Sequence, residues 1–148
     1  SLAGLTILKL FAWGDRRLRD NKDAVDLQTL LRSYGAAGNF DRMTDPDQAQ
    51  AFDRYLELGG DEEQTGAWLL GVDCGRLASG ETADGLRSLW GDENLREKLI
   101  DAMAFDDRGI KGARERAAEL FELFLNGFEE TRESERGWNE NARNDLPS

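Results

Sequence analysis

One lysine stands inside an apolar segment near the start of the chain, and two aspartates follow it at helical spacing. Lys9 lies among leucine, isoleucine and phenylalanine residues in the segment LTILKLFAWGD. In a buried helix a free ammonium group costs several kcal/mol, so Lys9 needs an exit to solvent or an acidic partner. Asp23 and Asp26 are three residues apart and share one face of a following helix. Antiparallel packing of the two helices would place that face opposite Lys9.

Two arginines lie between the lysine and the aspartates. Arg16 comes seven residues after Lys9 and would continue the same side of the first helix if the helix ran that far, and Arg17 is its neighbour. A lysine, flanking arginines and paired carboxylates at a helix N-terminus can hold a nucleoside triphosphate. One carboxylate would then orient the lysine or the nucleotide.

The same residues also have a purely structural interpretation. Asp23 follows Asp20 by three residues and can complete a capping arrangement. Asp26 can pair with Lys22 at four-residue spacing, which contributes only a few tenths of a kcal/mol. Lys9 can extend its ammonium group along the helix to the surface. Spacing alone leaves both interpretations open.

The chain is strongly acidic, but its charge is unevenly distributed. It has 148 residues and a formal net charge of −11, which argues against binding nucleic acid through its phosphates. Residues 1–23 hold five bases and three acids, a balance of +2, whereas the remaining residues have a balance of −13. A positive region against this background is a candidate anion site, and a solvated loop between two helices is the alternative.

The totals indicate one globular domain. The chain is 39% hydrophobic and 33% charged, and its longest apolar stretch, residues 2–13, is too short to span a membrane. No signal peptide is visible, so we expect a cytoplasmic protein without membrane contact. With one cysteine and no histidine the chain can form neither an internal disulfide nor a Ser-His-Asp set. A single cysteine without any histidine also lacks the partners for a thiol-based metal site, so we expect none. We place Cys74 in the core.

The hydrophobic periodicity predicts an all-α fold of six to seven helices that opens with an antiparallel helix pair. Period-two alternation and Asn-Gly hairpin signals are absent. We expect the first helix to be buried on most sides, and residues 35–45 to form a loop. A stripe of small residues should let the helix after Asp61 pack closely. The expected helices cover residues 2–13, 20–34, 45–58, 61–78, 82–90, 92–105 and 111–128.

The end of the chain changes in character. From Glu129 onward apolar residues almost disappear, so we expect a helical domain over residues 1–128 and a mobile tail over residues 129–148. Trp138 is an exposed aromatic residue in that tail. Three pairs of neighbouring acids are expected on solvated helix faces: Glu62-Glu63, Asp106-Asp107 and Glu129-Glu130.

The segment LTILKLFAWGDRRLRDNKDAVDL resembles the later part of bacterial nucleotidyltransferase-like proteins related to the AbiEii toxins of type IV toxin–antitoxin systems. In that family a lysine in a hydrophobic helix is followed by an arginine, and then by a basic residue, an aspartate, two spacers and Asp-Leu. The match falls on Lys9, on Arg16 or Arg17, and on residues 22–27. A second, vaguer match is GAWLLGVDCGRLA, residues 66–78.

The resemblance implies transfer of a nucleotidyl group from a nucleoside triphosphate to a hydroxyl on RNA, protein or a small molecule. Lys9 would contact the triphosphate, and Arg16 or Arg17 would support phosphate binding. Asp23, with Asp26 as the second choice, would be the acidic residue that this half contributes to the site.

The chain departs from the family in its missing first half. There a Gly-Ser and an Asp-x-Asp pair on a mixed sheet hold Mg²⁺, and no such element occurs in this sequence. We therefore expect the C-terminal part of a larger α/β protein, or a degenerate relative. Mg²⁺ and the triphosphate would belong to the complete protein, and this chain alone should bind no cofactor and catalyse nothing.

A different class of function is a non-catalytic helical interaction module that binds an antitoxin or self-associates. Its acidic surface and exposed aromatics would then matter more than Lys9. An apolar face left exposed on the first helix would indicate either the missing half or the partner in a homodimer formed through that helix.

Overall fold

A computed structural model describes residues 1–144, and these residues contain helices and no strand. The predicted all-α fold is confirmed, but the described residues form eight α-helices rather than six or seven. A kinked segment over Gly35–Asn39, whose backbone is not helical at Ala37 and Gly38, and a 3-10 turn over Phe105–Asp107 complete the elements. The helices are α1 (Leu2–Arg16), α2 (Lys22–Ser33), α3 (Phe40–Thr44), α4 (Ala49–Glu57), α5 (Glu62–Leu77), α6 (Gly80–Trp90), α7 (Glu93–Met103) and α8 (Ala113–Asn144).

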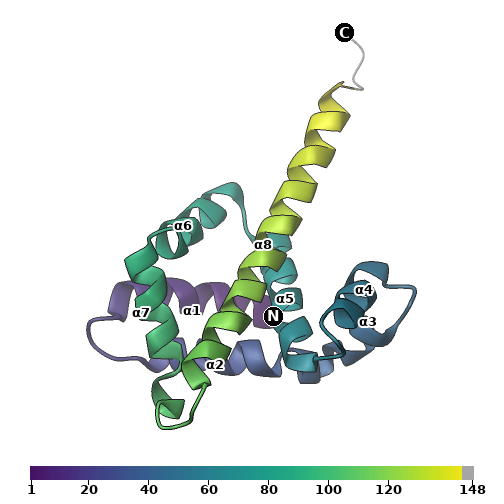
Figure 1. Cartoon of the computed structure of the whole chain (residues 1–148). Coiled ribbons are helices and arrows are strands. Elements are labelled where there is room, and N and C mark those ends of the chain that lie inside the picture. Colours follow the sequence, from purple (N-terminus) through teal and green to yellow (C-terminus); the bar gives the residue numbers. More distant parts are fainter. Residues whose placement is uncertain (145–148) are drawn as a thin grey trace.

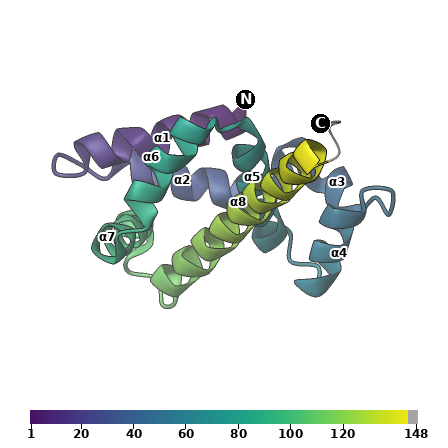
Figure 2. The same cartoon turned by 90° about the horizontal axis from the view of Figure 1, so that it is seen from above.

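Helices α5 and α8 form the centre of the fold. Helix α8 packs lengthwise along α5, with α3 and α4 on one side and α6 and α7 on the other (Figure 1 and Figure 2). Two glycines allow this packing. A Cβ atom at Gly71 would lie 2.0 Å from the carbonyl oxygen of Phe124, and one at Gly127 would lie 2.1 Å from that of Trp68. The two backbones are therefore in direct contact, as the stripe of small residues predicted.

Aromatic side chains of α8 fill the space between α5 and its neighbours. Phe121, Phe124 and Phe128 are buried, and Trp90 of α6 meets all three rings edge to face at centroid distances of 5.0–6.5 Å. Cys74 is completely buried, as expected, and its thiol lies 3.5 Å from the carbonyl oxygen of Ala3. The core thus joins α1, α5, α6 and α8.

Helices α1 and α2 form the predicted antiparallel pair. Lys9 contacts Asp26, and Arg16, further along α1, contacts the earlier residue Asp23, so the two helices run in opposite directions. Helix α1 extends two residues past Gly14, where it was expected to end. At the start of α2 the carboxylate of Asp20 accepts a hydrogen bond from the backbone N–H of Lys22 at 3.0 Å.

The prediction that α1 is buried on most sides is wrong. Its buried face consists of Ala3, Thr6, Ile7, Leu10 and Trp13, which pack toward α2, α5 and α6. Three leucines that were expected in the core lie on the other side of the helix. They remain exposed, at 38% for Leu2, 40% for Leu5 and 67% for Leu8. Helix α1 therefore carries an apolar stripe that the described part of the chain leaves partly exposed.

The segment around residues 35–49 also differs from its prediction. Residues 40–44, expected in a loop, form the short helix α3, and Gly38 provides the left-handed backbone conformation (φ +87°) that precedes it. Helix α4 begins at Ala49 rather than at Asp45, since the carboxylate of Asp45 accepts a hydrogen bond from the backbone N–H of Asp47 at 2.9 Å and stabilises a turn there.

Helix α8 does not end at Phe128 but continues to Asn144, projecting past the other helices (Figure 1). Its first turn beyond Phe128 is tied to α5, because the guanidinium group of Arg132 donates to the carbonyl oxygen of Ala78 at 2.7 Å. Mobility of the segment from Glu129 onward stays a prediction, and residues 145–148 lie outside the described residues. None of the helices in residues 1–144 has the length and apolar composition that crossing a bilayer requires.

Candidate functional site

Four of the five predicted site residues lie together between α1 and α2. The ammonium nitrogen of Lys9 is 3.1 Å from Oδ1 of Asp23 and 2.7 Å from Oδ2 of Asp26. The other carboxylate oxygen of Asp23, Oδ2, is 2.9 Å from Nη2 of Arg16. We call Lys9, Arg16, Asp23 and Asp26 the Lys9 cluster.

The Lys9 cluster runs from the interior to the surface. The Asp23 side chain is only 6% exposed and the Lys9 side chain 22%, whereas Asp26 is 41% and Arg16 54% exposed. Hydrogen bonds to Asp26, and next to Asp23, raise the pKa of the Lys9 ammonium group above its ordinary value. Lys9 is therefore held in its charged form by partners within the chain.

The contacts of the Lys9 cluster bear on the structural alternatives for Asp23, Asp26 and Lys9, namely capping, pairing with Lys22 and extension to the surface. Asp26 pairs with Lys9, while no ion pair to Lys22 occurs in the described chain. Asp23 does not take part in capping α2, whose N-cap is Asn21 and has no side-chain cap hydrogen bond, so both carboxylate oxygens of Asp23 are left for Lys9 and Arg16. Lys9 is thus neither a free buried cation nor a fully solvated one.

Two cations and two carboxylates balance each other in the Lys9 cluster. This closed set fastens α1 to the first turn of α2, and each polar group already has a partner of opposite charge. To bind a polyphosphate, Lys9 and Arg16 would have to exchange their carboxylate partners for phosphate oxygens. The geometry is therefore complete as a helix-to-helix clamp and needs rearrangement to serve as an anion site.

Arg17 does not join the Lys9 cluster. Its guanidinium group donates to the carbonyl oxygen of Gly14, one turn back in α1. It lines a separate pocket beside Trp13 and Leu18, which does not include Lys9. The predicted role of Arg17 beside Lys9 is therefore not supported by its position.

A second network, which was not predicted from the sequence, is centred on Asp73 in the C-terminal half of α5. Arg42 of α3 binds this carboxylate through both guanidinium nitrogens, at 2.7 and 2.9 Å, and the hydroxyl group of Tyr34 donates to it as well. Burial raises the pKa of Asp73, but the hydrogen bonds from Arg42 and Tyr34 outweigh burial and leave it below its ordinary value. The sequence holds one indication of this network, because Asp73 is the single acid in the apolar stretch GAWLLGVDCGRLA.

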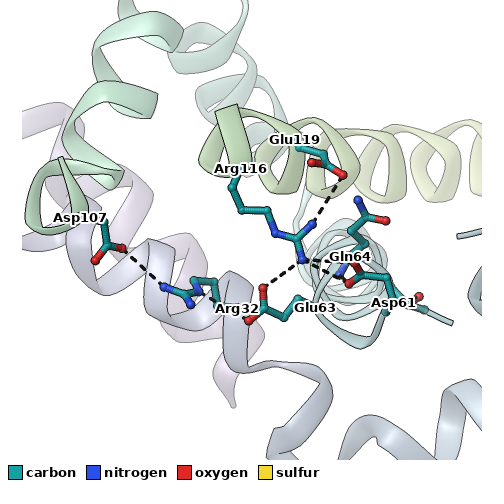
Figure 3. A network of polar contacts seen from close by, with 8 residues as sticks. Arg32, Asp61, Glu63, Gln64, Asp107, Arg116 and Glu119 are labelled. Atoms are coloured by element: carbon teal, nitrogen blue, oxygen red, sulfur yellow. Dashed lines mark hydrogen bonds and ion pairs between the residues drawn. The ribbon is translucent and has the colours of Figure 1, made fainter. Parts of the chain in front are cut away.

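Each of the three acidic pairs has at least one member with a basic partner, contrary to the solvated faces expected for them. Figure 3 shows Arg116 of α8 at the N-terminus of α5, 3.0 Å from Glu63 and 3.3 Å from Asp61. In the same view Arg32 of α2 reaches Asp107 at 3.5 Å. The first set of contacts ties α8 to α5, and the second ties α2 to the 3-10 turn, although each partly exposed pair contributes little by itself.

The pair Glu129-Glu130 links α8 to two further helices. Glu129 meets Arg87 of α6 at 2.9 Å, and Glu130 meets Arg54 of α4 at the same distance. Glu130 also accepts a hydrogen bond from the indole N–H of Trp68 at 3.1 Å. The expectation of a solvated acidic face is wrong here, because these carboxylates connect neighbouring helices.

Trp138, expected to be exposed, is 72% accessible and stands on the projecting part of α8. It lines a pocket of about 420 Å³ together with Trp68 and Arg76 of α5. The pocket is bordered by acids as well as by Arg76, so its charge does not favour an anion or a cation.

The residues of the Lys9 cluster do not fit a magnesium site. Asp23 and Asp26 both direct carboxylate oxygens at the Lys9 ammonium group, which occupies the position that a metal ion would need. Over residues 1–144 the structure places no three Cys, Asp or Glu side chains where they could hold a metal ion together.

Comparisons of the chain with protein-family models, with curated proteins and with solved structures found no match. The resemblance to AbiEii-related nucleotidyltransferases therefore rests on the quoted residues alone.

Proposed function

We propose that this chain is a non-catalytic helical interaction module that self-associates through the outer face of α1. The observation that carries the proposal is the row of exposed leucines Leu2, Leu5 and Leu8. Leu77, at the end of α5, is 55% exposed and lies 3.7 Å from the Cβ position of Gly4, so it extends the row sideways. We call these four leucines the α1 stripe.

A second copy of the chain fits the α1 stripe because the stripe is self-complementary. Leu2, Leu5 and Leu8 follow one another at intervals of three residues, so the row is symmetric about Leu5. A two-fold axis near Leu5 would place the two α1 helices antiparallel, with Leu2 of each copy against Leu8 of the other. Such an isologous contact closes on itself and gives a dimer rather than a fibre.

The charge distribution opposes contact through α1 less than contact through the rest of the surface. Each copy carries a net charge of −11, so most approaches between two copies are repulsive. Residues 1–23, which contain α1, have a balance of +2, against −13 for the rest of the chain. Two copies that meet through α1 keep their acidic surfaces apart.

The expected affinity is modest. The exposed fractions of the four leucines amount to about two complete leucine side chains in each copy. Burying the equivalent of four leucines in a dimer would release about 6–12 kcal/mol. Association costs about 4–15 kcal/mol in lost translational and rotational freedom. The two ranges overlap, so a dimer formed in this way should be weak, and its population should depend on protein concentration.

Sedimentation velocity from low to high micromolar concentration tests this proposal. The average mass of the wild-type chain should rise with concentration, whereas Leu8→Glu should remain monomeric throughout. A matched control is Leu56→Glu, because Leu56 on α4 is 60% exposed and lies away from α1; it should behave as wild type. A wild-type chain that stays monomeric at the highest concentration, or equal effects of both variants, would exclude the α1 stripe as the contact.

A second candidate is the nucleotide half-site that the sequence resemblance implies. The observation that favours it is the convergence of Lys9, Arg16, Asp23 and Asp26. In this case a triphosphate would take the place of the carboxylates on Lys9 and Arg16, and a separate Asp-x-Asp element would supply Mg²⁺. Calorimetric titration with a nucleoside triphosphate tests it: binding that is lost on Lys9→Ala supports the half-site. We rank it second because the cluster is already neutral and fully paired.

A further inference from the structure

A pocket of about 320 Å³ lies where the turn between α1 and α2 approaches the end of α7. Its apolar lining comes from Trp13 and Leu18 on one side and from Ala102 and Phe105 on the other. The volume falls at the lower end of the range for small-molecule sites. An apolar body of modest size therefore fits between the two pairs of side chains.

Two cations border this pocket and have no acidic partner. Arg17 donates only to a backbone carbonyl oxygen, and Lys98 is exposed on α7. Neither forms an ion pair within residues 1–144, although the chain has 30 acids and only 19 bases. Two unpaired cations on one pocket make a local surplus of positive charge in an otherwise acidic protein.

The acid of the pocket does not cancel this surplus. Asp101 lies on the pocket wall, but its carboxylate is bound by Nε of Arg114 at 2.6 Å. Arg114 also pairs with Glu97, so two carboxylates share one guanidinium group, but Arg17 and Lys98 still outnumber Asp101 on the pocket wall. The pocket consequently presents a positive rim above an apolar wall.

Two side chains of the pocket are left in unfavourable states. Leu18 is 92% exposed, although it stands next to the apolar wall. Trp13 is only 2% exposed, and its indole N–H has no hydrogen-bond partner in the described part of the chain. An apolar ligand body would cover Leu18, and a ligand oxygen or a trapped water is the type of partner that a buried N–H requires.

We propose that this pocket binds a small amphiphilic anion, namely a carboxylate with a short aliphatic or aromatic body. The carboxylate would pair with Arg17 and Lys98, and the body would lie against Trp13, Leu18 and Phe105. Charge-assisted hydrogen bonds from arginine suit a planar carboxylate. The site is separate from the α1 stripe, so its existence does not depend on self-association.

Octanoate is the probe for this proposal, and octanol, of equal chain length but without charge, is its matched control. Isothermal titration should detect octanoate binding and little or no octanol binding. Octanoate should also change the tryptophan fluorescence of the chain. This change should vanish in Trp13→Phe and persist in Trp138→Phe, because Trp138 lies on the projecting part of α8.

Charge removal locates the anion. Arg17→Ala and Lys98→Ala should each weaken octanoate binding about tenfold, the effect of one hydrogen bond to a charged group. Arg19→Ala is the matched control, since Arg19 is exposed in the same turn but does not line the pocket. Circular dichroism and thermal unfolding of each variant confirm that the fold is retained.

Several results would overturn the proposal. Absence of octanoate binding, equal binding of octanol, or an equal effect of Arg19→Ala would each do so. Binding to phosphatidylglycerol vesicles without binding of free octanoate would assign the cations to a lipid surface instead. Loss of octanoate binding in Leu8→Glu would place the probe on the α1 stripe rather than in the pocket.

Discussion

Replacement of Gly71 by alanine probes the backbone contact between α5 and α8 on which the fold depends. The added Cβ would lie 2.0 Å from the carbonyl oxygen of Phe124, 2.8 Å from its carbonyl carbon and 3.0 Å from the backbone nitrogen of Phe128. All three atoms belong to the backbone, so no side-chain rotation can relieve the clash. The helices would have to separate by about 1.4 Å to restore an ordinary contact distance of 3.4 Å.

The cost of this separation can be estimated. Overpacking a well-packed core costs about 1–3 kcal/mol, and occasionally more. A gap of about 1 Å forfeits up to half of the dispersion energy at each contact that it opens. Alanine returns about 1 kcal/mol through its better helix propensity. Because only backbone atoms are in the way, we take the upper end of the overpacking range and expect Gly71→Ala to lower the free energy of unfolding by about 2 kcal/mol, most of it from Phe121, Phe124 and Phe128 losing contact with α5.

Urea denaturation followed by circular dichroism measures this change. The control is Gly137→Ala, because Gly137 also lies within a helix but its Cβ would meet nothing within 4 Å. That variant should be neutral or more stable than wild type by up to about 1 kcal/mol. The two alanines should thus change stability in opposite directions. A Gly71→Ala chain within about 0.5 kcal/mol of wild type would refute the tight α5–α8 contact.

Three further predictions concern polar and reactive groups. Asp73→Asn removes the carboxylate that Arg42 binds and should lower the free energy of unfolding by about 2 kcal/mol. Because the pKa of Asp73 is lowered in the folded state, this loss should be full above about pH 4 and should shrink as the pH falls further. A loss of stability that does not change with pH would contradict this. Burial raises the pKa of the Cys74 thiol, so iodoacetamide should modify the folded chain far more slowly than the chain in urea, and equal rates would contradict a buried thiol. Lys9→Ala leaves a buried carboxylate with one partner fewer and should cost about 1–2 kcal/mol in urea denaturation, against almost nothing for the control Lys22→Ala.

Local patterns predicted the helices and the position of the first pair well. The apolar periodicity of α1 and α2 and the short link between them lead directly to an antiparallel pair, and this pair brings Lys9 to Asp23 and Asp26. The small residues of α5 likewise predicted close packing before its partner helix was known. In these cases the information lies within a few helical turns of sequence.

The face of α1 that is covered could not be predicted, because apolar residues occur on both sides of the helix. Periodicity shows that Leu5 and Leu8 share a face, but it does not show whether another element packs there. Helices α2, α5 and α6 pack against the face of α1 that holds Leu10 and Trp13, and the face of Leu5 and Leu8 stays partly exposed.

Long-range ion pairs were equally inaccessible. Arg42 was assigned to a loop, and it meets Asp73 only because α3 folds back against α5. The extension of α8 past Phe128 has a similar origin. Its polar residues have no periodic apolar face, but Glu129 and Glu130 find arginines on α6 and α4. Contacts of this kind depend on the tertiary arrangement and leave no periodic trace in the sequence.

Cross-linking through Leu5 tests the proposed self-association most directly. A two-fold axis near Leu5 brings this residue of both copies together, and the natural Cys74 is buried and does not compete. Under mild oxidation at high protein concentration, Leu5→Cys should form a disulfide-linked dimer and Leu56→Cys should stay monomeric. Equal cross-linking of the two variants, or none in Leu5→Cys, would contradict a dimer formed through α1.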